Sequence, residues 1–221
     1  MVTGTDLSDG AVPTRERIVA AAVELFGRRG YSATAVGEIE RAAGLTPRAG
    51  GFYKHFPSKR AVLEAAVARR AEAAAGARSL VDGALAGDVA SETAALGRAA
   101  LQIIAADQAV MRIVMREGDN FPELRDQFFE RIVRSGHEAT AAWLSNAAER
   151  AGVPPDAIDV PALASVVLGS IINHCVLRTL FGGDAGVADD RFLAAWTDST
   201  LKLLEANGLL VSDQPDREAS E

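Results

Sequence analysis

The chain has 221 residues, of which 48% are hydrophobic, 24% charged and 5% aromatic, and its formal net charge is −7. This composition is typical of a soluble globular protein and excludes a disordered or collagenous chain. The single cysteine, Cys175, excludes an intramolecular disulfide and every multi-cysteine metal site, so we expect a protein of the reducing cytoplasm with neither metal nor cofactor.

The first 12 residues are polar and lack the apolar stretch of a secretory signal, which predicts a mobile arm on a cytoplasmic protein. A first helix is expected to follow, with Thr14 as its N-cap and Gly30 as its end. A second, short helix is predicted between its N-cap Thr34 and Gly44. Both have apolar residues at helical spacing, so each should turn one face toward a common core.

A third helix is predicted to open at Thr46, because threonine caps helices and the proline that follows suits the first helical position, and to run through Phe56. The pair Gly50-Gly51 inside it has two interpretations. Either the backbone approaches a binding partner there, or the glycines mark a loop and the helix begins at Phe52. A fourth helix is expected from Lys59, and the predicted core of this small domain comprises Phe26, Ile39, Leu45, Phe52 and Phe56.

The remaining chain is rich in Ala and Leu and predicts helices of about ten to thirty residues, separated at Gly and Pro clusters. Nothing alternates strictly enough to predict a strand, so the fold class is all-α. Residues 160–177 contain no formally charged side chain, which is typical of either a membrane span or a helix buried in a core or a subunit interface. Pro161, Ser170 and Asn173 interrupt the apolar run and Arg178 follows it, so we favour a buried or interface helix and expect no membrane.

The charges are distributed unevenly along the chain. Residues 13–60 carry nine cationic and four acidic side chains, a net charge of +5, which leaves −12 for the rest. A cationic head on an anionic body is what a polyanion-binding module needs, although chance clustering of solvated charges gives the same sum. The cations are Arg15, Arg17, Arg28, Arg29, Arg41, Arg48, Lys54, Lys59 and Arg60.

Two predicted helices flank a tight turn at Gly44, an arrangement typical of a helix-turn-helix, whose second helix enters the major groove of DNA. The segment from Thr14 to about Ala66 resembles the DNA-binding domain of the TetR (tetracycline-repressor) family of bacterial transcriptional regulators. The resemblance lies in LFGRRGY, the helix start at Thr34, AAGLT across the turn and FYKHFPSK, in the order and approximate spacing of the family.

The chain departs from the common family pattern in two places. Glu40 follows the isoleucine of the second helix where most members have alanine, and the stretch between the turn and Phe52 is two residues longer. Two residues added to a helix rotate the residues after them by about 200°, so the extension changes which side chains face the bases. Extended forms of this turn also occur in the family, which indicates a subgroup variant.

The chemistry of the predicted third helix assigns the first DNA contacts. Arg48 and Lys54 are long donors for guanine edges or phosphates, and Thr46 reaches either kind of group. Gly50 and Gly51 remove side-chain bulk where the backbone would approach the duplex.

The resemblance to the TetR family implies further contacts. Tyr53 and His55 are expected at the sugar-phosphate backbone, although a packing role is the alternative for His55. Lys59 is expected to hold a phosphate together with the N-terminus of the fourth helix, and Thr34 is a further phosphate candidate.

The resemblance also implies a body that dimerises and holds a small-molecule effector, whose binding changes the separation of two heads on a palindromic operator. The uncharged helix at 160–177 and a last helix at about 188–206 are apolar enough for a four-helix dimer interface. Methionines, aromatic residues and two polar groups would line the pocket, although residues of these types also pack in cores. The candidates are Met111, Met115, Phe128, Phe129, Trp143, Asn173 and His174.

We therefore expect a homodimeric regulator of transcription, a repressor that a small, largely apolar effector releases from DNA. The predicted domains are a mobile arm (1–12), a helix-turn-helix domain (13–60), a helical effector-binding and dimerisation domain (61–210) and a mobile tail (211–221).

Two other functions fit parts of the sequence. An enzyme lacks support, because His137-Glu138 is followed by Ala141 where the zinc motif HExxH needs its second histidine. A helical ligand-binding or adaptor protein that no longer binds DNA is the closer alternative, with Glu40 and the extended turn as the lesions. The retained Arg48 argues against it.

Overall fold

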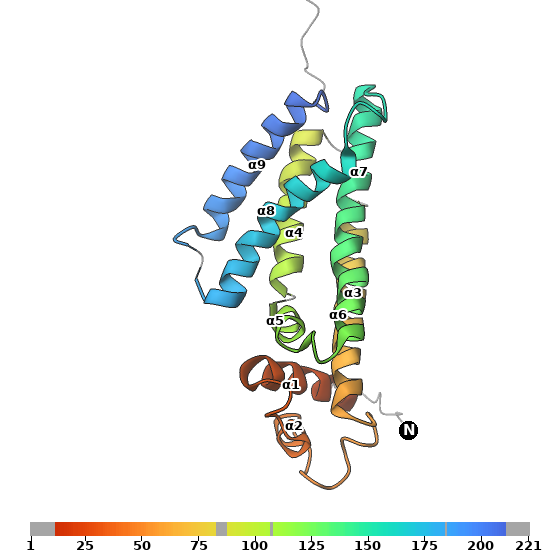
Figure 1. Cartoon of the computed structure of the whole chain (residues 1–221), viewed down its shortest axis with the longest axis vertical. Helices are drawn as coiled ribbons and strands as arrows, with labels where there is room; N and C mark the ends of the chain where they lie inside the picture. Colours follow the sequence, from red (N-terminus) through yellow and green to blue (C-terminus); the bar gives the residue numbers. More distant parts are fainter. Residues whose placement is uncertain (1–11, 83–87, 107, 184, 211–221) are drawn as a thin grey trace, which may run out of the picture. The chain divides into compact units, whose positions relative to one another are not determined.

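A computed structural model describes residues 12–82, 88–106, 108–183 and 185–210, so residues 1–11 of the predicted arm and the predicted tail lie outside the described residues. Within the described ranges every regular element is helical, which confirms the predicted fold class (Figure 1). The helices are α1 (Thr14–Arg29), α2 (Val36–Ala42), α3 (Lys59–Asp82), α4 (Val89–Ala106), α5 (Gln108–Glu117), α6 (Pro122–Phe128), the π-helix η1 (Phe129–Arg134), α7 (Ser135–Ala151), α8 (Val160–Phe181) and α9 (Asp189–Ala206).

The chain divides into two compact units. The first contains the chain up to Arg70 together with Ala109–Arg125, and the second contains Ala71–Gln108 and the chain from Asp126. The first unit therefore extends beyond the range predicted for the helix-turn-helix domain, into α3 and into most of α5 and half of α6. We call this first unit the head and the second the body.

The head is built on the apolar faces of α1, α2 and the start of α3. Phe26, Ile39 and Phe52 are almost completely buried, and each such side chain contributes about 1.5–3 kcal/mol by leaving water. Of the predicted core residues, Leu45 alone is half-exposed. α1 ends where predicted, because Gly30 adopts a φ of 91°, which favours glycine.

Two predicted N-caps differ from the structure. Thr14 is the first residue of α1, and Pro13 precedes it at the cap position. Thr34 is buried, and its hydroxyl donates to the Gly30 carbonyl at 2.8 Å, so α2 begins after Ala35 instead. The carboxylate of Glu38, three residues into the helix region, accepts from the Ala35 N–H at 2.9 Å and satisfies that end of α2.

Residues 109–125 contact the rest of the head through two carboxylates and one aromatic ring. Glu117 is buried and accepts from the Tyr31 N–H at 3.1 Å. The Phe121 ring meets the Tyr31 ring edge-on, with centroids 4.9 Å apart, and Arg60 forms an ion pair with Glu123. The stretch after α1 is thus held by a segment that lies more than eighty residues further along the chain.

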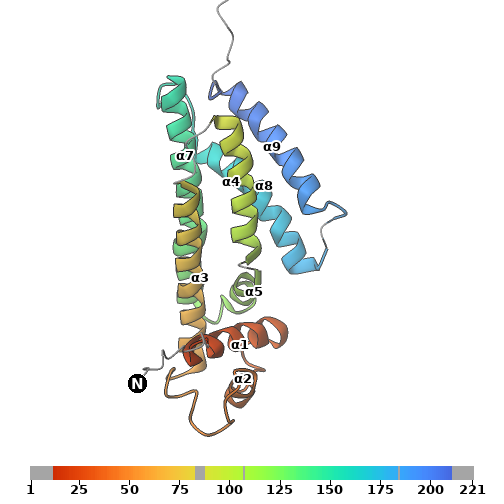
Figure 2. The same cartoon turned by 180° about the vertical axis from the view of Figure 1, so that it is seen from behind.

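The body is a bundle in which α8 packs against α4 and α7, and α9 packs against α4. α4 lies behind α8 in Figure 1 and in front of it in Figure 2, so one face of α8 is covered by α4. Breaks near Gly118, Gly152 and Gly182 fall where the sequence predicts them. The π-helix η1 and the separation of α4 from α5 were not predicted.

A buried carboxylate connects α4 to α7 inside the body. Glu92 accepts from the Trp143 indole N–H at 3.1 Å and from both terminal nitrogens of Arg150 at 2.9 and 2.6 Å. The hydrogen bonds from Arg150 lower the pKa of the Glu92 carboxyl. Trp143 itself packs in a cluster with Leu144 and Leu204.

α8 begins at a cap that the sequence contains, because Asp159 accepts from the Ala162 N–H at 3.1 Å. Among the described helices, α8 is the one with the length and apolar composition needed to cross a membrane, a test that the core helix of a soluble protein also passes. Its buried face contributes Val167, Ile171 and Cys175 to a cluster with Trp196. Burial raises the pKa of the Cys175 thiol, which keeps it protonated and indicates a packing role.

α4 and α9 pack tightly at Gly97. A Cβ at that position would lie 2.4 Å from Trp196 Cζ3, and the Trp196 indole is held in place by a 2.9 Å hydrogen bond to the Val167 carbonyl. We therefore expect Gly97→Ala to lower the free energy of unfolding by about 1–3 kcal/mol through overpacking. Urea unfolding followed by tryptophan fluorescence measures this change.

Gly76 provides the matched control, since it lies in α3 with open space around it. Gly76→Ala should raise stability by about 0.5–1 kcal/mol, because alanine loses less backbone entropy in a helix. Equal effects of the two substitutions would mean that the contact between Gly97 and Trp196 does not limit packing.

Candidate nucleic-acid interface

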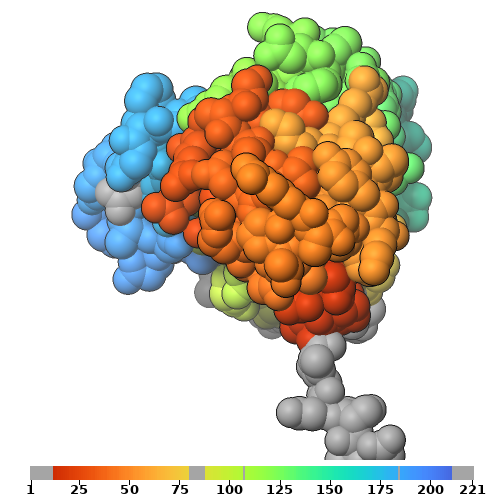
Figure 3. All heavy atoms as spheres, turned by 90° about the horizontal axis from the view of Figure 1, so that it is seen from below, coloured from red at the N-terminus to blue at the C-terminus, as the bar shows by residue number. Residues whose placement is uncertain are grey.

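The cations of the head are mostly at its surface. Of the nine predicted, eight are exposed and Lys59 is partly buried. Figure 3 views the head end-on, with the residues around position 50 drawn in orange in the foreground. We call residues 45–56 the recognition segment, since they occupy the place of the predicted third helix.

The recognition segment is a series of turns and not the predicted helix from Thr46 to Phe56. Arg48 and Gly50 have φ values of 65° and 75°, and residues in this left-handed region cannot continue an α-helix. A single helix-like turn remains, in which the His55 and Phe56 N–H groups both donate to the Phe52 carbonyl at 3.0 Å. The structure therefore agrees with the loop interpretation of Gly50-Gly51.

Glu40 on α2 holds the recognition segment through hydrogen bonds to its backbone. Its side chain is 2% exposed, and its two carboxylate oxygens accept from the N–H of Arg48 at 2.7 Å and of Phe52 at 3.1 Å. Its backbone carbonyl also accepts from the Leu45 N–H at 2.8 Å. The residue that the sequence presents as a departure from the family pattern thus supplies acceptors that a helix would otherwise have provided.

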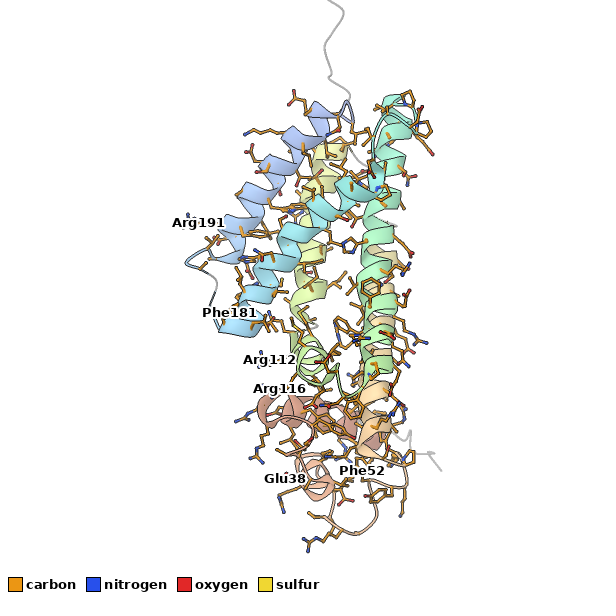
Figure 4. The ribbon with its side chains drawn as sticks, in the orientation of Figure 1. Glu38, Phe52, Arg112, Arg116, Phe181 and Arg191 are labelled. Carbon is orange, nitrogen blue, oxygen red and sulfur yellow. The ribbon has the colours of Figure 1, made fainter. Side chains whose placement is uncertain are left out.

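Aromatic anchors fix the other end of the recognition segment. Phe52 (Figure 4) and Phe56 are buried, and the Arg15 guanidinium lies 4.7 Å from the centre of the Phe56 ring. Tyr53, next to Phe52, is 60% exposed and meets the Phe52 ring edge-on. Phe52 and Phe56 therefore anchor the segment in the core, while the side chain of Tyr53 points toward solvent.

Most residues predicted to contact DNA lie exposed on this one segment. The structure brings together the side chains of Thr46, Arg48, Tyr53, Lys54 and His55, all of which are solvent-exposed. Gly50 and Gly51 are half-exposed in the middle of the same segment, and Leu45 packs within 3.4 Å of where a Cβ of Gly51 would lie.

Lys59 and Thr34 face the interior of the head. The Lys59 ammonium donates to the carbonyls of Tyr31 at 2.8 Å and Thr34 at 2.7 Å and lies 4.4 Å from the centre of the Tyr31 ring. Partial burial lowers the pKa of the Lys59 ammonium. Because the Thr34 hydroxyl is buried on the Gly30 carbonyl, we leave Thr34 out of the contacts proposed below.

The seven predicted pocket residues belong to different parts of the structure. Met111 and Met115 lie on α5 within the head, and Met115 is 55% exposed. The other five lie in the body, where Phe128 is buried, Phe129 is 47% exposed and Asn173 is exposed. Trp143 and His174 are buried.

His174 belongs to a polar cluster between α8 and α9 that the sequence did not reveal. Its Nε2 lies 3.0 Å from Asp189, and its ring stacks on Phe192 with centroids 4.1 Å apart. Arg178 also pairs with Asp189 at 2.6 Å, and the hydrogen bonds from His174 and Arg178 lower the pKa of the Asp189 carboxyl. Asp189 begins α9, and spacing along the sequence gives no signal that it meets a histidine fifteen residues earlier.

Comparisons with known proteins match both units. A family model described as bacterial regulatory proteins, tetR family, matches residues 18–66, and one described as the C-terminal domain of AefR-like transcriptional repressors matches residues 93–214. The HTH-type transcriptional regulator SrpR of Pseudomonas putida is 43% identical over 60 residues, which are 27% of this chain and 27% of that protein. The uncharacterized HTH-type transcriptional regulator YerO of Bacillus subtilis (strain 168) is 41% identical over 49 residues, 22% of this chain and 16% of that protein.

A solved structure shows the same fold at low identity. A transcriptional regulator (TerR/AcrR family) from Aquifex aeolicus VF5 superposes with a TM-score of 0.64 and 20% identity, over 87% of this chain and 99% of that one. The curated relatives are matched over less than a third of their own length.

These findings define a helix-turn-helix regulator of transcription with a helical C-terminal domain. The larger of the two matching models covers more than half of the chain. The chain belongs to the TetR family of bacterial regulatory proteins, which are DNA-binding transcriptional regulators and not enzymes.

The hydrogen bonds of Lys59 lead to a prediction that separates stability from DNA contact. Lys59→Met keeps the apolar stem and removes both bonds to backbone carbonyls, so we expect the free energy of unfolding to fall by about 1–3 kcal/mol. Lys54→Met, an exposed control in the same unit, should change stability by less than about 0.5 kcal/mol. Thermal and urea unfolding measure both. If Lys59→Met unfolds like the parent but loses DNA affinity, the expected phosphate contact is correct and the interior role is not.

Proposed function

We propose that this regulator is a repressor that binds a palindromic operator as a homodimer and leaves it when a small, largely apolar effector fills the body. The proposal of DNA binding rests on the recognition segment. In it the side chains of Arg48, Tyr53, Lys54 and His55 are exposed, and Phe52 is buried. Such a segment offers long donors and an aromatic hydroxyl to phosphates and base edges from a rigid base.

The contact roles follow from side-chain chemistry. Arg48 reads a guanine edge, since its planar guanidinium fits the two acceptors of guanine in the major groove. Lys54, Tyr53 and His55 contact the sugar-phosphate backbone, and Thr46 reaches a base edge or a phosphate. Lys59 contributes its positive charge from a partly buried position.

An exposed, uncharged stripe on α8 supports the homodimer. Ala162, Val166, Asn173 and Leu180 are all exposed, and their spacing puts them within about 40° of one another around the helix at 3.6 residues per turn. Val166 is 63% exposed, and Phe181 at the end of the helix is 78% exposed (Figure 4). An uncharged stripe of this length favours a second protein surface as its partner.

The effector part of the proposal rests on the body. The matched C-terminal model is described as that of transcriptional repressors, and the candidate pocket residues Phe128, Phe129, Trp143, Asn173 and His174 remain proposals. Release requires the effector to bind the DNA-incompetent arrangement more tightly, by about 1.4 kcal/mol for each tenfold loss of operator affinity. A metabolite that raises the melting temperature of the protein and also dissociates the operator complex would be identified as the effector. A metabolite that stabilises the protein without dissociating the complex would not be the effector of release.

A cytoplasmic location follows from the function, since the operator lies in the cytoplasm. We propose that α8 meets another subunit and not a bilayer, because Asp189 and Trp196 bond it to α9 and its remaining apolar face matches a dimer contact. The adaptor alternative is not favoured, since both curated relatives are HTH-type transcriptional regulators by name and Glu40 is built into the fold of the head.

DNA binding is tested with the intergenic DNA upstream of the gene, by fluorescence anisotropy over a range of salt concentrations. Arg48→Ala should reduce the preference for this DNA over random duplex by about 10- to 100-fold, because one base-reading donor is lost. Lys54→Ala should weaken both duplexes alike and reduce the salt slope by about one unit. Arg48→Ala should therefore change the sequence preference, and Lys54→Ala should change the affinity for any duplex. Identical effects of the two variants would refute the assignment of base and phosphate contacts.

The dimer interface is tested by a charge in the middle of the α8 stripe. Val166→Glu should raise the dimer Kd at least about 30-fold, because the new carboxylate must lose water on association. Ala142→Glu introduces the same charge at an exposed position of α7 and should leave the dimer intact. Sedimentation velocity reports both. A dimer that tolerates Val166→Glu would exclude this face as the interface.

A further inference from the structure

We propose that Glu40 is a positioning residue for DNA recognition: its buried carboxylate holds the extended recognition segment in the conformation that presents Arg48 and Tyr53. The inference rests on the DNA-binding function proposed above and adds a residue that itself touches no DNA. It also makes Glu40 and the two-residue extension a matched pair, in which each needs the other.

The hydrogen bonds of Glu40 hold the recognition segment at three points. Its backbone carbonyl takes the N–H of Leu45, one carboxylate oxygen takes that of Arg48 and the other takes that of Phe52. Glu40 on α2 therefore fixes three points of the recognition segment: its first residue, its middle and the start of its final turn. The segment between these points contains the left-handed Arg48 and Gly50, which no helical hydrogen bond supports.

Burial makes these bonds mutually dependent. A carboxylate that is 2% exposed is unfavourable unless hydrogen bonds replace the water it has lost, and the N–H groups of Arg48 and Phe52 are the donors that do so. Conversely, those N–H groups would lack their acceptor if residue 40 were alanine. The extension and the glutamate satisfy each other.

The same bonds set the direction of the contact side chains. The backbone N–H of Arg48 is hydrogen-bonded to the Glu40 carboxylate, and the φ of Arg48 is 65°. Together they fix the position and direction in which the Arg48 side chain leaves the backbone. Tyr53 directly follows Phe52, whose N–H is also held and whose ring is buried. Without Glu40 the segment must be ordered when DNA binds, which lowers the apparent affinity by the fraction of molecules in the binding conformation.

Positioning and a simple electrostatic effect predict opposite changes in operator affinity for Glu40→Gln. Glu40→Gln removes one negative charge from the DNA-binding head, and charge alone would therefore tighten binding to every duplex. An amide offers one acceptor oxygen and turns its own N–H groups toward the second backbone N–H, so positioning predicts the opposite for the operator.

The experiment compares the full-length parent with Glu40→Gln and with the control Glu24→Gln, an exposed carboxylate of α1 paired with Arg28. Binding to the upstream DNA and to random duplex is measured by fluorescence anisotropy, with circular dichroism to confirm folding. We expect Glu40→Gln to weaken operator binding at least about tenfold while random duplex is bound as tightly as by the parent or more tightly. Glu24→Gln should leave the ratio of the two affinities unchanged.

The outcomes are distinct. If the parent ignores the upstream DNA, the proposed function fails and this proposal fails with it. If the parent binds and Glu40→Gln keeps the preference of the parent for the operator, Glu40 is not a positioning residue, whereas DNA binding stands. A loss of the same size in both duplexes would also overturn the proposal, because positioning acts on the specific complex.

A second pair of variants tests the match between Glu40 and the extension even where Glu40→Gln fails to fold. Deleting Ala49 and Gly50 gives the segment the common family length and keeps Arg48. We expect Glu40→Ala to lower the melting temperature strongly, or to prevent folding, in the full segment and to have a clearly smaller effect in the shortened one. Equal losses in both backgrounds would show that Glu40 stabilises the head independently of the extension.

Discussion

The conformation of the recognition segment depends on how backbone groups outside helices are satisfied. Turns leave N–H and C=O groups without helical partners, and a small domain cannot afford to bury them unpaired. Several side chains of the head supply such partners: Glu40 accepts from the recognition segment, Glu117 accepts from Tyr31, and Lys59 donates to the carbonyls of Tyr31 and Thr34. Charged groups make the stronger hydrogen bonds, so each fixes a stretch of irregular backbone.

This arrangement gives different tasks to charges of the same sign. Exposed cations such as Arg48 and Lys54 remain free in water, where their worth lies in attraction to a polyanion. Lys59 instead has its ammonium on two carbonyls and an aromatic ring. Among the carboxylates, Glu24 pairs at the surface, where an ion pair contributes little, while Glu40 is buried and structural. Net charge distinguishes the head, and burial separates the solvated charges from the structural ones.

Hydrophobic periodicity was sufficient to predict the all-α fold, the ends of most helices and nearly the whole head core, because these depend on neighbours close in the sequence. It failed for the recognition segment, where Thr46 and the following proline are a good helix start that the positive φ of Arg48 overrides. The interior roles of Lys59 and Glu117 could not be predicted, since their partners lie far away along the chain. The exposure of Arg48, Tyr53, Lys54 and His55 fits the contacts expected from their chemistry and the family resemblance, and these contacts stay a prediction.

Glu40 shows how a local rule can be broken without loss of the fold. A carboxylate on the inner face of a short helix and two extra residues in the following turn each look unfavourable when considered alone. Together they exchange a regular helix for an irregular segment whose order is fixed before DNA arrives. A segment that is already ordered loses less conformational entropy on binding, and the left-handed residues change the direction in which Arg48 leaves the backbone. A change in the length of the recognition segment therefore gives a route to a different set of base contacts only when residue 40 changes with it.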